Sequence, residues 1–224
     1  MKAKWLVVPL ILFSIGSIGS IAFTKQDLAW IKAVKGEYGE RAGKRVSAWR
    51  NLIEDIDNQS ENEKLEQVNR FFNQLYFVDD IKLWGKKDYW ATPLEFLGSN
   101  AGDCEDFTIA KYFSLLELGV PDKKLRLIYL KALELDQFHM VLAYYPTPSA
   151  IPLILDNLDK EIKPATQRTD LLPIYSFNGQ HLWLMKGKGN GQQAGRSSRL
   201  SLWNDLRQRN KGLRLNHPII NYDE

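Results

Sequence analysis

The single cysteine of this 224-residue chain occupies a position that suits a nucleophile. Cys104 lies in the segment SNAGDCEDFTIAKYFSLLELGVP, where apolar residues recur every three positions from Phe107 to Leu116. This spacing predicts a helix that starts between Gly102 and Cys104 and ends at Gly119. Backbone N–H groups and the helix dipole at such a start lower the pKa of a thiol and can stabilise an oxyanion. Cys104 is therefore a candidate catalytic nucleophile, and a buried core cysteine is the alternative.

A thiolate nucleophile needs a base, usually histidine, and that base needs a third group to orient it. The chain offers three histidines: His139, His181 and His217. Only His139 gains a carboxylate partner from simple strand geometry, because it begins one arm of a predicted β-hairpin. Without the cysteine, His139 would be interpreted as an ordinary half-buried strand residue.

The predicted hairpin joins the extended segments 138–145 and 151–156, which are rich in branched and aromatic residues. In the register where opposed residue numbers sum to 295, His139 lies opposite Asp156. Cross-strand neighbours on one face have Cβ atoms about 4.5–5.5 Å apart, close enough for an imidazole to meet a carboxylate. Pro152 in the second arm favours an edge strand or a bulge, which would shift this register. We predict His139 as the base and Asp156 as the residue that orients it.

Three acidic residues crowd the predicted nucleophile: Asp103, Glu105 and Asp106. Their charges would oppose thiolate formation, and a bound cation would remove the conflict. Carboxylate oxygens suit Ca²⁺, which takes about six to eight oxygen ligands, so more ligands would have to come from the preceding aromatic segment. The simpler interpretation is that acidic residues in a first helical turn complement the helix dipole, with Asp103 as N-cap.

The segments that position these residues follow the order helices, then strands. The apolar period predicts two or three helices over 25–73, and the aromatic-rich stretch 76–100 is predicted to be a structured loop without a regular period. After the helix of Cys104 we expect strands at 125–133, 138–145, 151–156 and 177–185, a Gly-rich segment at 187–195 and a last helix at 201–210. This order favours an α+β domain in which N-terminal helices pack on an antiparallel sheet.

The first 22 residues fit the plan of a secretory signal peptide. Lys2 and Lys4 precede an uncharged run whose most apolar part is 5–13, and small residues at 20–22 suit a signal peptidase. We therefore expect an exported protein whose mature domain is 23–224. A retained membrane anchor is the alternative, although the Ser/Gly-rich second half of the run spans a bilayer poorly. One cysteine allows no intramolecular disulfide.

The charge balance argues against a nucleic-acid partner. The chain has 30 basic and 27 acidic residues, scattered among one another, and a formal net charge of +3. So mild a charge lacks the basic footprint of a DNA- or RNA-binding protein. The hydrophobic content of 44% is that of an ordinary globular protein, and we expect one domain.

The segments AGDCEDFTIAKYFSLLELGVP, HMVLAYY and LILDNL resemble those of the LapG-type bacterial transglutaminase-like cysteine proteases. The resemblance extends over about residues 30–203. It implies a papain/transglutaminase-like core with the nucleophile at a helix N-terminus. Carried over by position, the family's catalytic triad falls on Cys104, His139 and Asp156, the residues that helix and strand geometry also select.

The same resemblance implies a cofactor, a substrate and a partner. It implies dependence on Ca²⁺, which favours Asp103, Glu105 and Asp106 as metal ligands. It implies a periplasmic endopeptidase that cleaves a large surface adhesin in its N-terminal region, near paired alanines, and so disperses biofilm. An inner-membrane receptor for cyclic di-GMP holds such a protease back. By likeness to related sites, Trp90 is a candidate for lining the oxyanion region, although core packing is the ordinary role of a tryptophan.

Two other functions are compatible with these residues. The same triad would serve a transglutaminase or an amidase that acts on glutamine, cell-wall peptide or small amides. A catalytically inactive module would instead bind a membrane partner through exposed aromatic residues. An assay that compares amine incorporation with peptide cleavage distinguishes a transglutaminase from a protease. A Cys104→Ala variant that keeps its biological effect would indicate the binding module.

Overall fold

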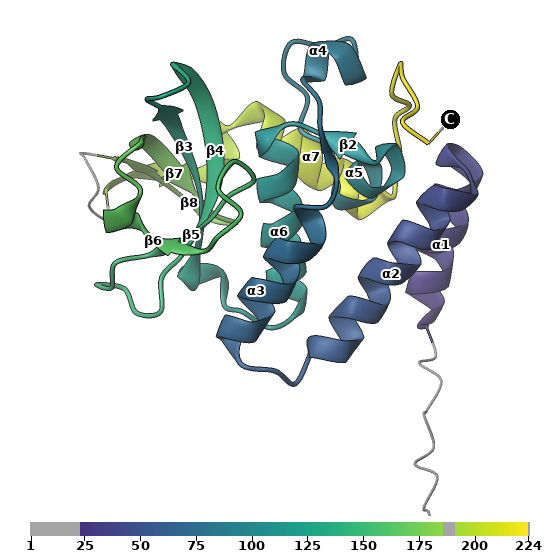
Figure 1. The fold of residues 1–224 in the computed structure, drawn as a ribbon, viewed down its shortest axis with the longest axis horizontal. Coiled ribbons are helices and arrows are strands. Elements are labelled where there is room, and N and C mark those ends of the chain that lie inside the picture. Colours follow the sequence, from purple (N-terminus) through teal and green to yellow (C-terminus); the bar gives the residue numbers. More distant parts are fainter. Residues whose placement is uncertain (1–22, 186–190, 224) are drawn as a thin grey trace, which may run out of the picture.

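The computed structural model describes residues 23–185 and 191–223, so the predicted signal peptide at 1–22 lies outside the described residues. Figure 1 shows the helices gathered on one side of the molecule and the sheet on the other, with α6 (Cys104–Glu117) between them. This arrangement confirms the predicted α+β fold. No helix in the described ranges has both the length and the apolar character needed to cross a membrane.

The N-terminal segment forms three helices, α1 (Lys25–Tyr38), α2 (Glu40–Ile56) and α3 (Glu61–Phe72). Thr24 and Ser60 form capping boxes at the starts of α1 and α3, each with the acidic residue three positions later. Gly39 separates α1 from α2 with a φ of 97°, a conformation that glycine adopts without strain. The two or three helices predicted for 25–73 are thus three.

One antiparallel sheet of seven strands follows, in the spatial order β6-β5-β4-β3-β7-β8-β9, counted over the described residues. The strands are β3 (Leu125–Ala132), β4 (Gln137–Tyr144), β5 (Leu153–Leu155), β6 (Lys163–Pro164), β7 (Leu171–Phe177), β8 (His181–Leu184) and β9 (Gln192–Arg196). Short 3₁₀ turns lie at Asp122–Lys124, Ala165–Gln167 and Ser197–Arg199. Three predicted strands, at 125–133, 138–145 and 151–156, correspond to β3, β4 and β5.

The predicted strand at 177–185 is confirmed only over 181–184, because the segment begins with a turn. β7 ends at Phe177 and β8 begins at His181. Between them the Asn178 side-chain oxygen accepts the backbone N–H groups of Gln180 and His181, at 3.0 and 2.9 Å. Asparagine followed by glycine is a common signal for such a turn. The segment therefore supplies the end of one strand and all of the next.

The aromatic stretch 76–100 is more regular than predicted. It contains β1 (Tyr76–Phe77), α4 (Asp80–Leu83) and α5 (Pro93–Ser99), and β1 pairs with β2 (Ala101–Gly102). α5 begins with a capping box of Thr92 and Glu95. Arg209 of the last helix, α7 (Ser201–Gly212), donates to the carbonyl of Trp90 at 2.6 Å and also pairs with Glu95. The C-terminal helix thereby fixes this stretch in place.

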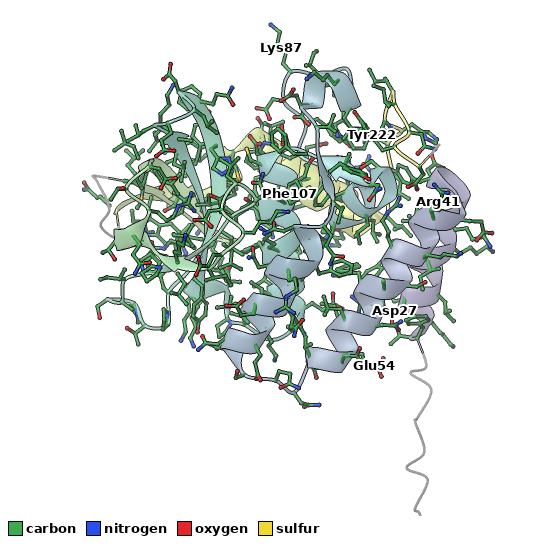
Figure 2. All side chains as sticks on the ribbon, viewed as in Figure 1. Asp27, Arg41, Glu54, Lys87, Phe107 and Tyr222 are labelled. Carbon is green, nitrogen blue, oxygen red and sulfur yellow. The ribbon has the colours of Figure 1, made fainter. Side chains whose placement is uncertain are left out.

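Helix α6 joins the two layers. Its Phe107 is buried in the middle of the molecule, as Figure 2 shows. On the sheet side, the Thr108 hydroxyl donates to the backbone carbonyl of Met140 in β4 at 2.9 Å. The first turn of α6 therefore lies against β4 near His139, which brings the predicted nucleophile and the predicted base to the same place.

Candidate active site

Cys104 is the first residue of α6, after the N-cap residue Asp103, as predicted. Its side chain is nearly buried, and the thiol donates to the Glu105 carboxylate at 2.9 Å. Burial raises the pKa of the thiol well above its usual value, and the charges of Glu105 and Asp103 raise it further. Among the main causes, only the nearby Met140 N–H lowers the pKa of the thiol. Burial and the carboxylates therefore outweigh the stabilisation of a thiolate that we expected from the helix start.

His139 and Asp156 form the predicted pair. The His139 Nε2 atom lies 2.7 Å from Asp156 Oδ1, and both side chains are buried. The predicted register is nevertheless wrong, because Leu142 pairs with Leu155, so opposed numbers sum to 297. A shift of two residues keeps both side chains on one face of the sheet, where diagonal neighbours still meet.

The shift has a local cause at the second arm of the hairpin. Pro152 has no N–H to donate to the ladder, and its carbonyl instead accepts the N–H of Ala165 at 2.9 Å. Regular pairing with β4 therefore begins only at Leu153. Asp156 lies just beyond the end of β5 and reaches His139 diagonally rather than from directly opposite.

The His139 imidazole has one nitrogen that does not face Asp156. Because Nε2 is bound to Asp156, Nδ1 is the ring nitrogen that could accept a proton from the predicted nucleophile. The Cys104 sulfur lies close enough to the Met140 N–H to be influenced by it, and that N–H belongs to the peptide bond that follows His139. The three predicted triad residues thus gather where the first turn of α6 meets β4. Neither other histidine belongs to this group: His217 is exposed and paired with Glu37, and His181 begins β8.

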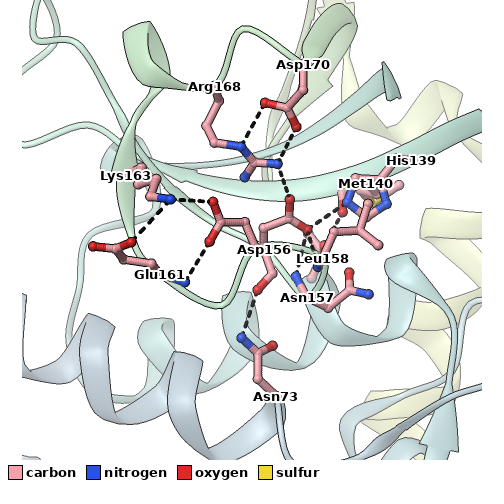
Figure 3. A network of polar contacts seen from close by, with 12 residues as sticks. Asn73, His139, Met140, Asp156, Asn157, Leu158, Glu161, Lys163, Arg168 and Asp170 are labelled. Carbon is pink, nitrogen blue, oxygen red and sulfur yellow. Dashed lines mark hydrogen bonds and ion pairs between the residues drawn. The ribbon is translucent and has the colours of Figure 1, made fainter. Parts of the chain in front are cut away.

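The Asp156 carboxylate is held on every side, as Figure 3 shows. Oδ1 also accepts the N–H groups of Asn157 and Leu158, at 2.7 and 3.1 Å, and Oδ2 accepts a bond from Arg168 at 2.8 Å. Burial raises the pKa of Asp156, but the hydrogen bond and charge of His139 and the charge of Arg168 lower it to about 2. Asp156 is therefore a carboxylate at neutral pH and can fix the His139 ring.

No pattern in the sequence points to Arg168, which lies twelve positions after Asp156 and is almost completely buried. Arg168→Met is expected to lower the free energy of unfolding by about 3–5 kcal/mol, because it leaves Asp156 as a buried carboxylate with one partner fewer. Arg168→Lys should lose less, since a cation remains. Urea denaturation of both variants measures this. Arg70→Met, which removes an exposed arginine of α3, is the control, and an equal loss in all three variants would contradict the assignment.

Lys111 is a second residue that sequence reasoning missed. It lies on α6 two turns after Cys104 and is completely buried, and its Nζ donates to the backbone carbonyl of Asp156 at 3.0 Å. Asn73, the C-cap residue of α3, donates to the same carbonyl at 2.8 Å. Burial lowers the pKa of Lys111 to about 7, although the Asp156 charge raises it. The helix that carries the nucleophile is thus tied directly to the backbone of Asp156.

This lysine predicts a pH dependence of stability. Because the folded pKa of about 7 lies below the unfolded value, the unfolded chain binds more protons between about pH 7 and 10, and stability rises with pH in that window. We expect the wild type to gain about 2 kcal/mol from this group between pH 7 and 9, relative to Lys111→Met. Denaturant titrations at the two pH values measure the difference. Lys82→Met, at an exposed position, should behave as the wild type; an unchanged pH slope in Lys111→Met would refute the prediction.

The acidic residues beside Cys104 belong to a larger cluster. One carboxylate oxygen each of Asp80, Asp103 and Asp106 lies within 4.8 Å of the others, and Asp103, Cys104 and Glu105 form a second such group. Asp88 lies near enough to Glu105 for their charges to repel. The acidic residues on α6 and at its N-cap were predicted from the sequence. Asp80 and Asp88, which come from the aromatic stretch, were not. The aromatic stretch thus brings two further carboxylates close to Asp103 and Glu105.

The cluster has the properties of a cation site. Oδ1 of Asp80 and Oδ1 of Asp103 are buried, and neither has a hydrogen-bond donor among the described residues. Burial and neighbouring charges raise the pKa of Asp80 to about 7 and that of Asp103 to about 12. Asp106 is partly committed elsewhere, since its two oxygens accept the N–H groups of Ala91 and Asp103. Unpartnered hard oxygen atoms at this density fit Ca²⁺.

A cavity of about 190 Å³ opens beside Glu105, the residue that follows the predicted nucleophile. It is lined by Asp88, Trp90, Glu105, Tyr129, Tyr175, Leu200, Ser201 and Leu202. Trp90 is nearly buried and stacks on Phe177 with ring centroids 5.7 Å apart. The indole therefore packs in the core, as the simpler interpretation held, and also forms part of the cavity wall next to Glu105.

Comparison with known proteins agrees with this arrangement. A family model described as bacterial transglutaminase-like cysteine proteinase BTLCP matches residues 28–181. Two solved structures of LapG from Legionella pneumophila, one EGTA-treated and one calcium-bound, are similar at 43% and 42% sequence identity, with TM-scores of 0.73 and 0.71. Each match covers 82% of this chain, and 96% and 98% of the respective LapG chain. A comparison with curated proteins gave no match.

Proposed function

The chain belongs to the family of bacterial transglutaminase-like cysteine proteinases and is a cysteine protease of the LapG type; on this premise we propose that it is a calcium-dependent endopeptidase that cleaves the N-terminal region of a large surface adhesin. The observation that carries the catalytic part is the convergence of Cys104, His139 and Asp156 at the junction of α6 and β4. The 43% identity with LapG supports a related substrate.

The proposed reaction follows from the roles of the three residues. His139 Nδ1 takes the proton of Cys104, and the thiolate attacks the peptide carbonyl carbon, whose oxygen becomes an oxyanion near the N–H groups at the start of α6. The C–N bond then breaks, and His139 returns the proton to the leaving amine. Water, deprotonated by His139, attacks the thioester and releases the new carboxyl end and the free thiol. Asp156 stays ionised and stabilises the imidazolium in both halves.

The acidic cluster supports a calcium site in this chain. Asp80, Asp103, Glu105 and Asp106 would hold the ion, and Asp88 lies near Glu105. Asp106 also fixes the preceding loop through its bond to the Ala91 N–H. When bound, the ion supplies positive charge that balances the carboxylates around the nucleophile. One of the similar LapG structures is calcium-bound and another is EGTA-treated, which supports the choice of Ca²⁺ over other cations.

The location and regulation are proposed from the sequence. The segment 1–22 fits a cleaved signal peptide, so we place the mature protein, 23–224, in the periplasm. There we expect an inner-membrane receptor for cyclic di-GMP to bind the protease and keep it from the adhesin. Release of the adhesin would then disperse biofilm.

The test is to incubate the mature protein with an N-terminal adhesin fragment, with calcium or with EGTA. We expect discrete fragments only with calcium, and none with Cys104→Ala. An amine-incorporation assay run in parallel detects a transglutaminase. Amine transfer without peptide cleavage would overturn the protease proposal, and full cleavage in EGTA would overturn its calcium dependence.

A further inference from the structure

Three aromatic side chains form a stacked row across three neighbouring strands. Phe138 of β4 stacks on Tyr129 of β3 with ring centroids 5.3 Å apart and planes 18° apart. Tyr129 stacks in turn on Tyr175 of β7, at 4.9 Å and 21°. Tyr129 is directly opposite both Met140 and Tyr175 in the sheet, so the row lies on the face that the helices cover further along.

The helices leave the outer end of this row uncovered. Phe138 is 61% exposed, and Leu172, which shares its face through the paired residue Lys131, is 48% exposed. The only charge close to the Phe138 ring in the described contacts is the Lys131 ammonium, 5.2 Å away, and it is neutralised by Asp136. We refer to Phe138, Tyr129, Tyr175 and Leu172 as the open sheet face. Its outer end, at Phe138 and Leu172, is apolar, and its inner end, at Tyr129 and Tyr175, lies near the carboxylates of Asp88 and Glu105.

The open sheet face is continuous with the catalytic site. Tyr129 and Tyr175 line the cavity beside Glu105. Phe138 and His139 are successive residues of β4, so their side chains point to opposite faces of the sheet, and the continuity runs through Tyr129 and Tyr175. A polypeptide that enters the cavity next to Glu105 therefore has this apolar surface beside it.

We propose that the open sheet face binds an extended, apolar segment of the protein substrate that flanks the cleaved bond. This inference rests on the proposed protease function and assigns the residues that select the substrate. Continuity with the cavity favours the substrate over a second copy of the chain or the receptor, since neither needs to reach the nucleophile. The row offers flat rings for apolar side chains, and the carboxylates of Asp88 and Glu105 at its inner end disfavour an acidic segment.

The experiment compares Phe138→Ala with the wild type on two substrates after the cut bond has been mapped. One is the N-terminal adhesin fragment, and the other is a short peptide with only the residues next to that bond. We expect KM for the fragment to rise about two- to tenfold, with a much smaller effect on kcat, because an exposed stacking contact is lost. The KM change on the short peptide should be smaller. Phe138→Leu should recover part of the loss.

Leu28→Ala is the matched control, because Leu28 is 55% exposed on α1, outside the open sheet face. It should cleave the fragment as the wild type does. An unchanged KM in Phe138→Ala, an equal KM change on both substrates, or an effect on receptor binding alone would overturn the inference. Absence of cleavage by the wild type would instead overturn the proposed function, and the inference with it.

Discussion

Cys104→Ala is expected to lower the rate of adhesin cleavage by at least about 10⁴-fold, because it removes the only atom that can form the thioester. The fold should survive, since the thiol makes a single side-chain hydrogen bond, to Glu105, and alanine suits the first turn of a helix. Single-turnover cleavage of the adhesin fragment measures the rate. Far-ultraviolet circular dichroism and the melting temperature establish that the variant is folded.

His139→Ala should cause a loss of the same order, and combining the two changes should add little, because nucleophile and base act as one unit. His181→Ala is the control, since His181 lies on β8 and takes no part in the site. A Cys104→Ala protein that retains a tenth of the wild-type rate would refute the mechanism. Strictly additive losses in the double variant would show that His139 is not the base of Cys104.

The contact between His139 and Asp156 could be predicted from the sequence because strand geometry tolerates error. The hairpin register was wrong by two residues, yet His139 and Asp156 meet at 2.7 Å, because side chains in a strand repeat with a period of two. An error of one residue would have placed them on opposite faces. The helix start at Cys104 was equally robust, since the apolar stripe and the acidic first turn both mark it.

The supporting residues could not be predicted for the opposite reason. Arg168 follows a 3₁₀ turn outside any periodic segment, and only the fold brings its guanidinium to Asp156. Asp80 reaches Asp103 in the same way, from a short helix in a stretch whose apolar residues have no period. Contacts between irregular segments that are far apart in the sequence produce no recognisable pattern of residue spacing. The turn at Asn178 differs, because the asparagine–glycine pair is a signal that the strand prediction overlooked.

Removal of calcium is expected to have the second-largest effect. Buried carboxylates from two segments, including Asp80 on α4 and Asp103 before α6, repel one another unless a cation or protons neutralise them. A bound ion at about 100 times its Kd would stabilise the folded chain by about 2.7 kcal/mol. For a chain of this size, EGTA should therefore lower the melting temperature by about 5–10 °C. Differential scanning calorimetry at constant pH measures this shift, and the cleavage rate should fall with it.

Asp103→Asn distinguishes a bound ion from a general effect of charge. Asparagine is as good an N-cap as aspartate, so the start of α6 is preserved while one ligand charge is lost. The variant should be as stable as the wild type in EGTA, or more so, because one repulsive carboxylate is gone, but it should gain little from added calcium. Asp57→Asn, at an exposed position after α2, should respond to calcium as the wild type does. Equal calcium responses in all three proteins would place the ion elsewhere, and no response in the wild type would mean that the carboxylates are neutralised by protons alone.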